Sequence, residues 1–392
     1  MNTQAKGKTV KSLLISGEFF PPAIGGIPNY MASMVEALGP ERVCCLTGVK
    51  ADSRLDCDSR RPNVFRRPLV FSKSTVLEGG AWLASLIEIM LKEHPRAVQL
   101  ATLYDGHLGM WLQKWLGLPY VVYTHGNEVL NALQARGERH RLVLQRANCV
   151  LANSSYTADL VKQGGVQADR IEIVHPGCDA EEFRPYCPSS EYRQGILGRH
   201  AAGKVILTVG RLVSRKGHDR VIQALPRILK CHPDVCYLVA GDGPARQELD
   251  EISNRLGVAD KVIFLDKVLD ADLPLIYNLC DVFVMPSRED VAGSDVEGFG
   301  LVFLEANACN KPVVGAQSGG MADAIVDGET GLLVPPNDEM ALTASICRLL
   351  GDATYMRRLG QQGRDRVVRD FGWRSIADRV DAIVSGLIVK DR

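Results

Sequence analysis

The sequence predicts an α/β fold built from two doubly wound parallel sheets. Short apolar, β-rich runs alternate with amphipathic segments along the whole chain, which is typical of parallel strands covered by helices on both faces. A chain of 392 residues with 46% hydrophobic content is too long for one ordinary core and predicts two domains. Both halves show the same alternation, so we expect two similar Rossmann-like domains that face each other across a cleft.

The candidate strands fall into two sets. In the first half they are Lys11–Ser16, Val43–Thr47, Ala97–Ala101, Tyr120–Thr124, Cys149–Asn153 and Ile171–Val174. In the second half they are Val205–Val209, Cys236–Ala240, Lys261–Leu265, Val282–Met285, Pro312–Gly315 and Gly331–Val334. Such sheets bind ligands at the carboxyl ends of their strands, so residues that follow a strand are the candidate site residues.

A polar, proline-containing stretch from Cys178 to Lys204 separates the two sets and has no strand pattern of its own. We interpret it as the interdomain connection. The first domain is then expected at residues 1–178 and the second at residues 179–372.

The composition limits the class of protein. The formal net charge is zero, with an excess of basic residues in the first half and of acidic residues in the second, so no nucleic-acid partner is expected. The 11 cysteines form no CxxC pair, and several in apolar runs indicate reduced, buried thiols: Cys44, Cys149, Cys236 and Cys280. Neither a signal peptide nor a membrane anchor is expected at the N-terminus, which favours a cytoplasmic protein.

The run DVEGFGLVFLEA carries two acids, Glu297 and Glu305, around a pair of glycines. Gly298 and Gly300 let the backbone approach a ligand, and the apolar residues after them predict a helix whose first amides attract an anion such as phosphate. If Glu305 lies two turns into that helix, both acids can face one ligand. The alternative is an ordinary helix start with one solvated glutamate.

Two cations and a glycine turn follow strands of the second half. Arg211 offers a planar fork for phosphate oxygens and Lys216 a mobile point charge, so the pair can grip a diphosphate; otherwise this loop is merely basic and solvated. Gly241 and Gly243 predict a tight turn directly after the strand Cys236–Ala240.

The first half carries a second glycine pair and a histidine. Gly25 and Gly26 precede a helix-like run, and their amides can cap an anion. No G-x-G-x-x-G follows the first strand, which argues against a dinucleotide-dependent dehydrogenase. His125 follows the strand Tyr120–Thr124 beside a glycine and is a candidate ligand contact, whereas most lone histidines are structural.

A set of segments resembles the retaining glycosyltransferases of family 4: PPAIGGIPNY, THGNEV, VHPGCDAEEFRP, VGRLVSRKG, VAGDGP, EGFGLVFLEA and GLLVPP. The resemblance covers nearly the whole chain, in the family's order. It implies the GT-B fold, with a nucleotide-sugar held mainly by the second domain. It also implies a final helix, at about residues 373–392, that crosses back onto the first domain.

The resemblance implies a role for each motif residue. The catalytic residues would be His125, Arg211, Lys216 and Glu297. The donor-binding residues would be Gly25, Gly26, Gly241, Gly243, Val268, Gly298, Phe299, Gly300, Leu301 and Glu305. Among them Arg211 and Lys216 would hold the diphosphate, Glu297 would contact the donor sugar, and Glu305 would bind the ribose hydroxyls. The turn at Gly241 and the segment with Val268 would surround the base.

The expected charges suit the family's chemistry. Departure of a nucleoside diphosphate builds negative charge, which cations and a helix N-terminus stabilise in the transition state. We therefore expect no cofactor and no bound metal, because no D-x-D follows a convincing strand and the DCD at Asp56–Asp58 lies in a polar loop. The sugar would keep its anomeric configuration, and Glu297 is not expected to be a nucleophile.

The donor and the acceptor stay open. The stretch REDVAGSDV before Glu297 is longer than in many family members and is similar to that of bacterial phosphatidylinositol mannosyltransferases. A UDP-hexose and GDP-mannose both fit, and the acceptor can be a glycan or a lipid-linked molecule. The alternatives are an epimerase or phosphorylase of the same architecture, and a non-catalytic nucleotide-sugar-binding protein.

Aromatic and basic residues lie near one another in the first half. Trp111 and Trp115 precede a basic cluster made of Arg136, Arg139, Arg141 and Arg146. Such a face can rest on anionic lipid, which would place the protein peripherally at the inner face of the membrane. Alternatively, the tryptophans pack in the core and the arginines are solvated.

Overall fold

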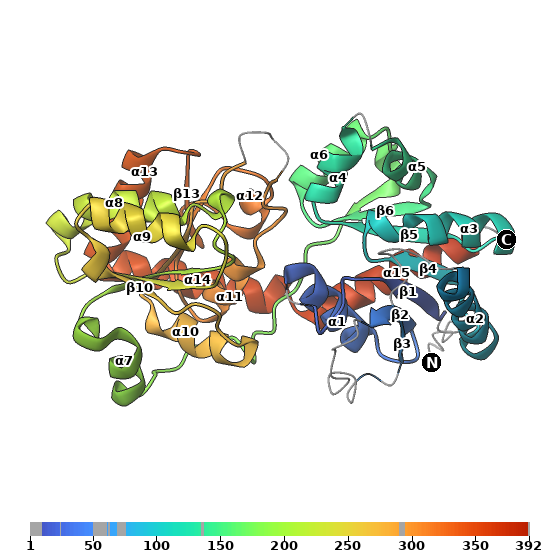
Figure 1. Cartoon of the computed structure of the whole chain (residues 1–392), viewed down its shortest axis with the longest axis horizontal. Helices are drawn as coiled ribbons and strands as arrows, with labels where there is room; N and C mark the ends of the chain where they lie inside the picture. Colours follow the sequence, from blue (N-terminus) through green and yellow to red (C-terminus); the bar gives the residue numbers. More distant parts are fainter. Residues whose placement is uncertain are drawn as a thin grey trace, which may run out of the picture. The chain divides into compact units, whose positions relative to one another are not determined.

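A computed structural model describes residues 10–23, 25–49, 61, 63–68, 76–134, 137–289 and 295–390. It divides the chain into two compact units (Figure 1). The first unit combines Met1–Pro176 with Trp373–Arg392, and the second unit is Gly177–Gly372. The division therefore falls after Pro176, whereas we expected it after Cys178.

The first unit contains a seven-stranded sheet in the order β3-β2-β1-β4-β5-β6-β7, in which every pair is parallel. Its strands are β1 (Ser12–Ser16), β2 (Val43–Val49), β3 (Val64–Pro68), β4 (Ala97–Leu100), β5 (Tyr120–Thr124), β6 (Cys149–Ala152) and β7 (Ile171–Ile173). The chain runs outward from β1 to β3 and then returns to β4 on the other side of β1. The strand order thus reverses between β1 and β4, which makes this the topological switch point.

Helices cover both faces of the first sheet. They are α1 (Gly26–Leu38), α2 (Val76–Glu93), α3 (Gly106–Leu116), α4 (Asn127–Leu133), α5 (Glu138–Arg146), α6 (Ser155–Gln163) and α15 (Trp373–Lys390). Side chains of α2 to α6, such as Trp82 and Leu112, form one core cluster with the sheet, and those of α1 and α15 form another. Two faces buried under helices explain why these strands are almost wholly apolar.

Helix α15 belongs to the first unit although it ends the chain. It packs against α1, as Figure 1 shows in red and blue. Ile376, Ala377 and Val380 are buried in the same core cluster as α1, and the Trp373 and Tyr30 ring centroids lie 5.6 Å apart. An ion pair of 2.6 Å between Arg42 and Asp378 adds a polar contact at the edge of this packing.

The second unit contains a six-stranded parallel sheet in the order β10-β9-β8-β11-β12-β13. Its strands are β8 (Val205–Val209), β9 (Cys236–Ala240), β10 (Val262–Phe264), β11 (Val282–Met285), β12 (Val313–Ala316) and β13 (Gly331–Val334). The strand order reverses between β8 and β11. This second switch point is the expected ligand site of the second sheet.

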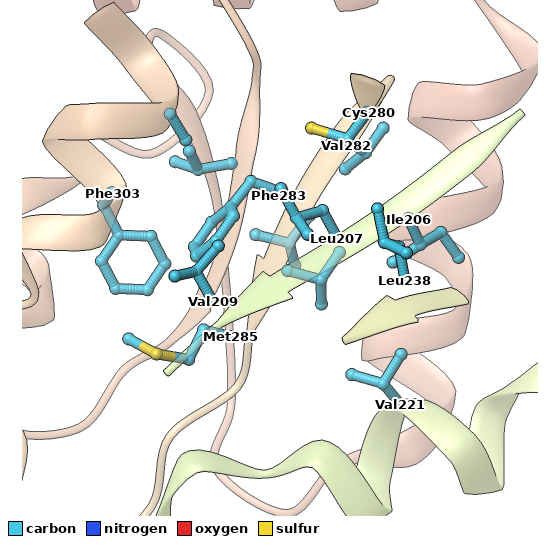
Figure 2. Close-up of a cluster of buried hydrophobic side chains, with 14 of the residues drawn as sticks. Ile206, Leu207, Val209, Val221, Leu238, Cys280, Val282, Phe283, Met285 and Phe303 are labelled. Atoms are coloured by element: carbon cyan, nitrogen blue, oxygen red, sulfur yellow. The ribbon is translucent and has the colours of Figure 1, made fainter. Parts of the chain in front are cut away.

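The helices of the second unit are α7 (Ser190–Leu197), α8 (His218–Cys231), α9 (Arg246–Arg255), α10 (Leu273–Leu279), α11 (Leu301–Ala308), α12 (Met321–Ala324), α13 (Glu339–Gly351) and α14 (Ala353–Asp370). Figure 1 shows α8 and α9 on one side of the sheet and α10 on the other. Figure 2 shows the core between them, where Leu207 of β8 and Phe283 of β11 lie together. Phe303 of α11 meets Phe283 edge-on at 5.6 Å and so fixes that helix on the sheet.

These two sheets confirm the predicted fold class, but two details of the prediction were wrong. The strand β3, Val-Phe-Arg-Arg-Pro, was missed because two arginines and a proline interrupt its apolar pattern; its place at the edge of the sheet tolerates them. The stretch from Cys178 to Lys204 is not a free connection. Cys178 and Phe183 are buried in the core of the second unit, and Ser189 caps the helix α7 through the amide of Tyr192.

The predicted thiols are buried as expected. Cys44, Cys149, Cys236 and Cys280 are all free and buried, and burial raises the pKa of each. Thiols of this kind are weak nucleophiles, because the reactive species is the thiolate.

The tryptophans of α3 do not pack in the core. Trp111 is 42% exposed and Trp115 is 65% exposed, so the core interpretation of these residues was wrong. The apolar side of the helix that does face the core carries Leu112 and Gly109 instead. The predicted acidic run at residues 56–58, Arg136 and most of the long loop before Glu297 lie outside the described residues.

Candidate functional site

The candidate site of the second unit lies at the switch point between β8 and β11. The loop after β8 contains Arg211 and the short helix η5 (Ser214–Lys216). The chain after β11 leads to Glu297 and to Gly300, the N-cap residue of α11. Because parallel strands have their carboxyl ends at one edge, the sheet brings these two loops together.

Glu297 accepts hydrogen bonds from two cations of the β8 loop. Its Oε2 lies 2.5 Å from Lys216 Nζ and 2.7 Å from Arg215 Nη1. Arg215 Nε lies 2.8 Å from the Asp295 carboxylate, so the guanidinium bridges two acids. The side chains of Lys216, Glu297 and Arg215 are only 12%, 14% and 19% exposed. This cluster, which we call the charged cluster, is therefore largely shielded from solvent.

The charged cluster keeps Glu297 ionised. Burial alone would raise the pKa of Glu297, but the adjacent Lys216 ammonium and Arg215 guanidinium outweigh it and lower the pKa. Arg215 is desolvated too, yet Glu297 and Asp295 raise its pKa. Two cations and two carboxylates thus balance one another, with Asp295 at the solvent-exposed side of the cluster, and an anionic ligand can compete for the cations.

A second set of contacts fixes the loop that carries the cations. The Arg288 guanidinium makes a bidentate ion pair with Asp219, at 3.0 and 3.1 Å, and donates to Ser214 Oγ at 2.8 Å. The Arg288 amide donates to the Arg215 carbonyl at 2.8 Å. The buried His218 contacts the Arg211 carbonyl at 3.4 Å, and burial lowers its pKa to about 4, so its ring stays neutral. The cations are therefore held before any ligand arrives.

The glycine turn after β9 supports the same loop by close backbone contact. A Cβ atom at Gly241 would lie 2.0 Å from the Gly210 carbonyl oxygen, and one at Gly243 would lie 2.4 Å from that of Leu212. Gly241 also has a φ of 146°, which side chains rarely allow. These glycines were predicted for a turn near a ligand; in the structure they let two loops of the protein touch.

The helix α11 begins at Gly300, whose φ of 92° also favours glycine. A Cβ there would lie 2.6 Å from the ring of Phe303. The predicted residues Gly298, Phe299 and Gly300 are all buried, and Leu301 opens the helix. The first amides of a helix form an end that attracts anions.

Glu305 lies in the second turn of α11, and the Tyr277 hydroxyl donates to its Oε2 at 2.6 Å. Burial raises the pKa of Glu305 to about 7; the Tyr277 bond and the charge of Lys216 counteract it, whereas Asp270 and Glu182 add to it. Lys216 thus acts on both acids predicted for this site. The two acids differ, because Glu297 is held ionised and Glu305 is partly protonated near neutral pH.

This difference predicts how stability depends on pH. Below pH 4.5, the usual pKa of a glutamate, Glu305 is protonated in both the folded and the unfolded protein. Between pH 4.5 and about pH 7 it ionises only in the unfolded protein. The free energy of unfolding therefore falls as the pH rises through this range. We expect Glu305→Gln to gain roughly 1 to 3 kcal/mol over wild type between pH 5 and pH 8, measured by urea unfolding. Glu297→Gln is the matched control. The pKa of Glu297 is lowered, so the stability that this group gives to wild type is lost as the pH falls, and the pH dependence has the opposite sign. Equal pH profiles for wild type and Glu305→Gln would contradict the assignment.

The predicted residues of the first unit also follow strands of their sheet. Gly25, with φ 145°, is the N-cap of α1, and both Gly25 and Gly26 are exposed. His125 follows β5, and its Nε2 lies 2.9 Å from the Ala101 carbonyl after β4. Its backbone amide donates to the buried carboxylate of Glu128, which opens α4. The His125 ring is thereby fixed at the carboxyl edge of the first sheet, and its Nδ1 takes no part in the contact with Ala101.

Not every predicted residue joins the charged cluster. Arg211 lies on the same loop as Lys216, but its side chain is exposed and pairs with no carboxylate of the described chain. Arg215, which was not among the predicted residues, joins the cluster. It was missed although it precedes Lys216 in sequence, because the side that each residue of a 3-10 turn faces cannot be read from spacing. Val268, four residues beyond β10, is partly buried against the core.

No group of three or more His, Cys, Asp or Glu side chains suited to a metal ion occurs in the part of the chain that the structure describes. None of the helices described is long and apolar enough to cross a membrane.

Two family models match the chain. Residues 24–182 match Glycosyltransferase Family 4, and residues 194–366 match Glycosyl transferases group 1. The fold and the models together define a glycosyltransferase of the GT-B type.

A relative along nearly the full length fixes the family. A GDP-mannose-dependent alpha-(1-6)-phosphatidylinositol monomannoside mannosyltransferase of Mycolicibacterium smegmatis is 30% identical over 95% of this chain and 98% of its own. A D-inositol 3-phosphate glycosyltransferase of Salinispora tropica is 34% identical over 71% of this chain and 61% of its own. The chain belongs to the family 4 glycosyltransferases, as its motifs predicted.

Solved structures agree with the fold. HepE of Anabaena, in complex with UDP and glucose, has a TM-score of 0.79 at 22% identity and covers 96% of this chain and 100% of its own. Sucrose-phosphate synthase of Thermosynechococcus elongatus has a TM-score of 0.80 at 23% identity, with 97% and 100% covered. At such identities the likeness concerns the fold alone.

Proposed function

We propose that this chain is a retaining, metal-independent mannosyltransferase that moves mannose from GDP-mannose to a glycolipid acceptor at the cytoplasmic face of a membrane. The names of the full-length mycobacterial and corynebacterial relatives favour GDP-mannose over a UDP-hexose as donor, and a phosphatidylinositol mannoside as acceptor.

The charged cluster is the observation that carries the proposal. Lys216 and Arg215 present two nearly buried cations at the switch point of the second sheet, next to the start of α11. A diphosphate there would accept hydrogen bonds from Lys216 and from the amides of Gly300 and Leu301. Because Lys216 now binds Glu297, donor binding would release that carboxylate toward the sugar hydroxyls. Arg211, exposed on the same loop, would reach the outer phosphate oxygens.

The reaction would then proceed without a metal. The bond between the anomeric carbon and the phosphate oxygen breaks, and its electron pair leaves with the nucleoside diphosphate. The acceptor hydroxyl attacks on the same face and passes its proton to a phosphate oxygen. Lys216, Arg215 and the helix start would stabilise the growing negative charge, which is strongest in the transition state.

Glu305 would hold the ribose. A carboxylate accepts from both ribose hydroxyls only when ionised, so donor binding would lower the pKa of Glu305 from about 7 and release a proton. Donor affinity should therefore weaken below pH 7. Tyr277→Phe removes the hydrogen bond that favours the ionised form, and we expect it to move this pH dependence upward.

Donor identity can be tested by thermal shift and turnover. GDP and GDP-mannose are expected to raise the melting temperature more than UDP, UDP-glucose or ADP-glucose, because a ligand that binds only the folded state stabilises it. Turnover with GDP-mannose should persist in EDTA. A larger rise in melting temperature with a UDP-sugar would show that the donor is a UDP-sugar and not GDP-mannose. Activity that is lost in EDTA and restored by Mg²⁺ would contradict metal independence.

Exposed apolar side chains on the first unit support membrane contact. On α2, Leu83, Ile87 and Leu91 are 46%, 51% and 70% exposed at intervals of one helical turn. On α3, Trp111 and Trp115 are exposed, and both helices pack into the same core cluster on one face of the sheet. Exposed cations of this part, namely Lys92, Lys114, Arg139 and Arg146, suit an anionic bilayer.

Vesicle binding tests this contact. We expect Ile87→Glu combined with Trp115→Glu to weaken binding to vesicles that contain phosphatidylinositol by at least about tenfold, since apolar insertion and charge attraction both suffer. Leu269→Glu combined with Met340→Glu, at exposed positions of the second unit, is the matched control and should bind like wild type. Equal loss in both double variants, or no binding by wild type at low salt, would rule out this surface.

A further inference from the structure

The switch point of the first sheet carries a cluster of rings that the donor site does not use. Glu18 and Phe19 follow β1, and Tyr104 lies in the short helix η2 (Leu103–Asp105) that follows β4. These strands are neighbours in the sheet, with Ser12 opposite Ala97. The cluster therefore occupies the place where doubly wound sheets bind ligands.

Three aromatic rings meet there. The Phe19 and Tyr104 rings are stacked, with centroids 6.0 Å apart and planes at 17°. His140 of α5 meets Tyr104 edge-on at 5.4 Å. Tyr104 remains 48% exposed, so part of this ring surface is open to solvent. We call this set the aromatic ledge.

A buried carboxylate holds the ledge in place. Asp105 is 6% exposed, and its Oδ1 accepts from the Gly17 amide at 3.2 Å. Its Oδ2 accepts from Thr102 Oγ1 at 3.4 Å, and Thr102 Oγ1 accepts from the Tyr104 amide at 3.3 Å. The loop after β1 and the turn after β4 are thus tied together, so Phe19 and Tyr104 are positioned before a ligand binds.

An exposed acid and a histidine ring lie beside the ledge. Glu18 is exposed, and its charge reaches Asp105. Burial and the neighbouring His107 lower the pKa of His140, which favours its neutral ring. A phosphate on the bound ring would meet Glu18, whereas a neutral polyol would find a carboxylate that accepts from its hydroxyls.

We propose that the aromatic ledge binds a ring of the acceptor, and that this ring is an unphosphorylated polyol such as the mannosyl ring of a monomannoside. The C–H face of such a ring packs on Tyr104 and Phe19, while Glu18 and the His140 ring bind hydroxyls. The inference rests on the proposed function and narrows it. Of the two acceptor chemistries in the relatives' names, it selects the monomannoside over D-inositol 3-phosphate.

Acceptor kinetics of the full chain test the ledge. With GDP-mannose and vesicles that carry phosphatidylinositol monomannoside, we expect Tyr104→Ala to raise the acceptor KM by about tenfold or more, as loss of a stacked ring does. Tyr104→Phe keeps the ring and should stay within about twofold of wild type. The dissociation constant of GDP-mannose should be unchanged in both. An unaltered acceptor KM in Tyr104→Ala would overturn the proposal.

Glu18→Lys tests the charge argument. It should weaken the use of the monomannoside and improve competition by D-inositol 3-phosphate, which wild type should tolerate poorly. Equal competition by D-inositol 3-phosphate and methyl α-mannoside in wild type would contradict the preference for a neutral ring.

Failure of the proposed function is distinguishable from failure of the ledge. If wild type neither binds GDP-mannose nor forms product, the donor assignment fails. Saturation-transfer NMR then still measures binding of methyl α-mannoside to the aromatic ledge, because this experiment needs no turnover. A signal in wild type that Tyr104→Ala abolishes supports the ledge, and no signal in wild type overturns it.

Discussion

Lys216→Ala is expected to lower kcat/KM by about 10² to 10³, the usual effect of removing one preorganised group that stabilises transition-state charge. Lys216 is 12% exposed and bound to Glu297, so its charge acts through little water and is held in place by the protein. If the diphosphate binds there, the loss should appear mainly in kcat, because the charge on the leaving group grows as the bond breaks. Steady-state kinetics with saturating acceptor measures it.

Two control variants sharpen this prediction. Arg211→Ala removes a cation from the same loop that is exposed and outside the charged cluster, so it should cost less than Lys216→Ala. Arg215→Ala removes the partner of both Glu297 and Asp295 and should also impair turnover. Wild-type kinetics in Lys216→Ala, or a larger loss in Arg211→Ala, would show that the leaving group lies elsewhere.

Gly241→Ala is expected to destabilise the second unit by roughly 2 to 4 kcal/mol. The new Cβ would lie 2.0 Å from the Gly210 carbonyl, which is backbone and cannot move away as a side chain does. The φ of 146° adds strain of its own. Because the same contact supports the loop with Lys216, we expect weaker GDP-mannose binding in the fraction that stays folded.

Gly257→Ala is the matched control for Gly241→Ala. Gly257 also has a positive φ, of 67°, but nothing lies within 4 Å of its Cβ position. It should cost about 1 kcal/mol, from backbone strain alone, with donor binding unchanged. Urea unfolding separates the two variants, and an equal cost would mean that the loops do not depend on the close contact at Gly241.

Most of the fold could be predicted because buried parallel strands are apolar throughout. Strands such as Val205–Val209 and Tyr120–Thr124 were placed at their observed bounds, since helices cover both faces and the pattern is continuous. The strand β3 was not predicted. It lies at the edge of the sheet and pairs with a strand on one side, and edge strands tolerate arginine and proline. The helix α7 was not predicted, because its buried apolar side chains, such as Leu197, are few and lie in a polar stretch of sequence.

The site was predicted less completely than the fold. Gly300, Lys216 and Glu297 follow strands or open a helix, so their approach to one another follows from topology. The entry of Arg215 into the charged cluster does not, because it depends on which way each residue of η5 (Ser214–Lys216) turns. The pKa difference between Glu297 and Glu305 also depends on neighbours such as Tyr277, which lies far away in sequence.

Formation of a hexosylated acceptor is the most direct test of the central claim. The full-length chain is incubated in EDTA with GDP-mannose and vesicles of phosphatidylinositol monomannoside, and the lipid is analysed by mass spectrometry and by NMR of the new anomeric carbon. We expect a lipid one mannose heavier with the α configuration of the donor, and about 100-fold less of it or lower with Lys216→Ala at matched times. A folded wild-type chain that binds GDP-mannose but forms no such product, or a β-linked product, would contradict the account.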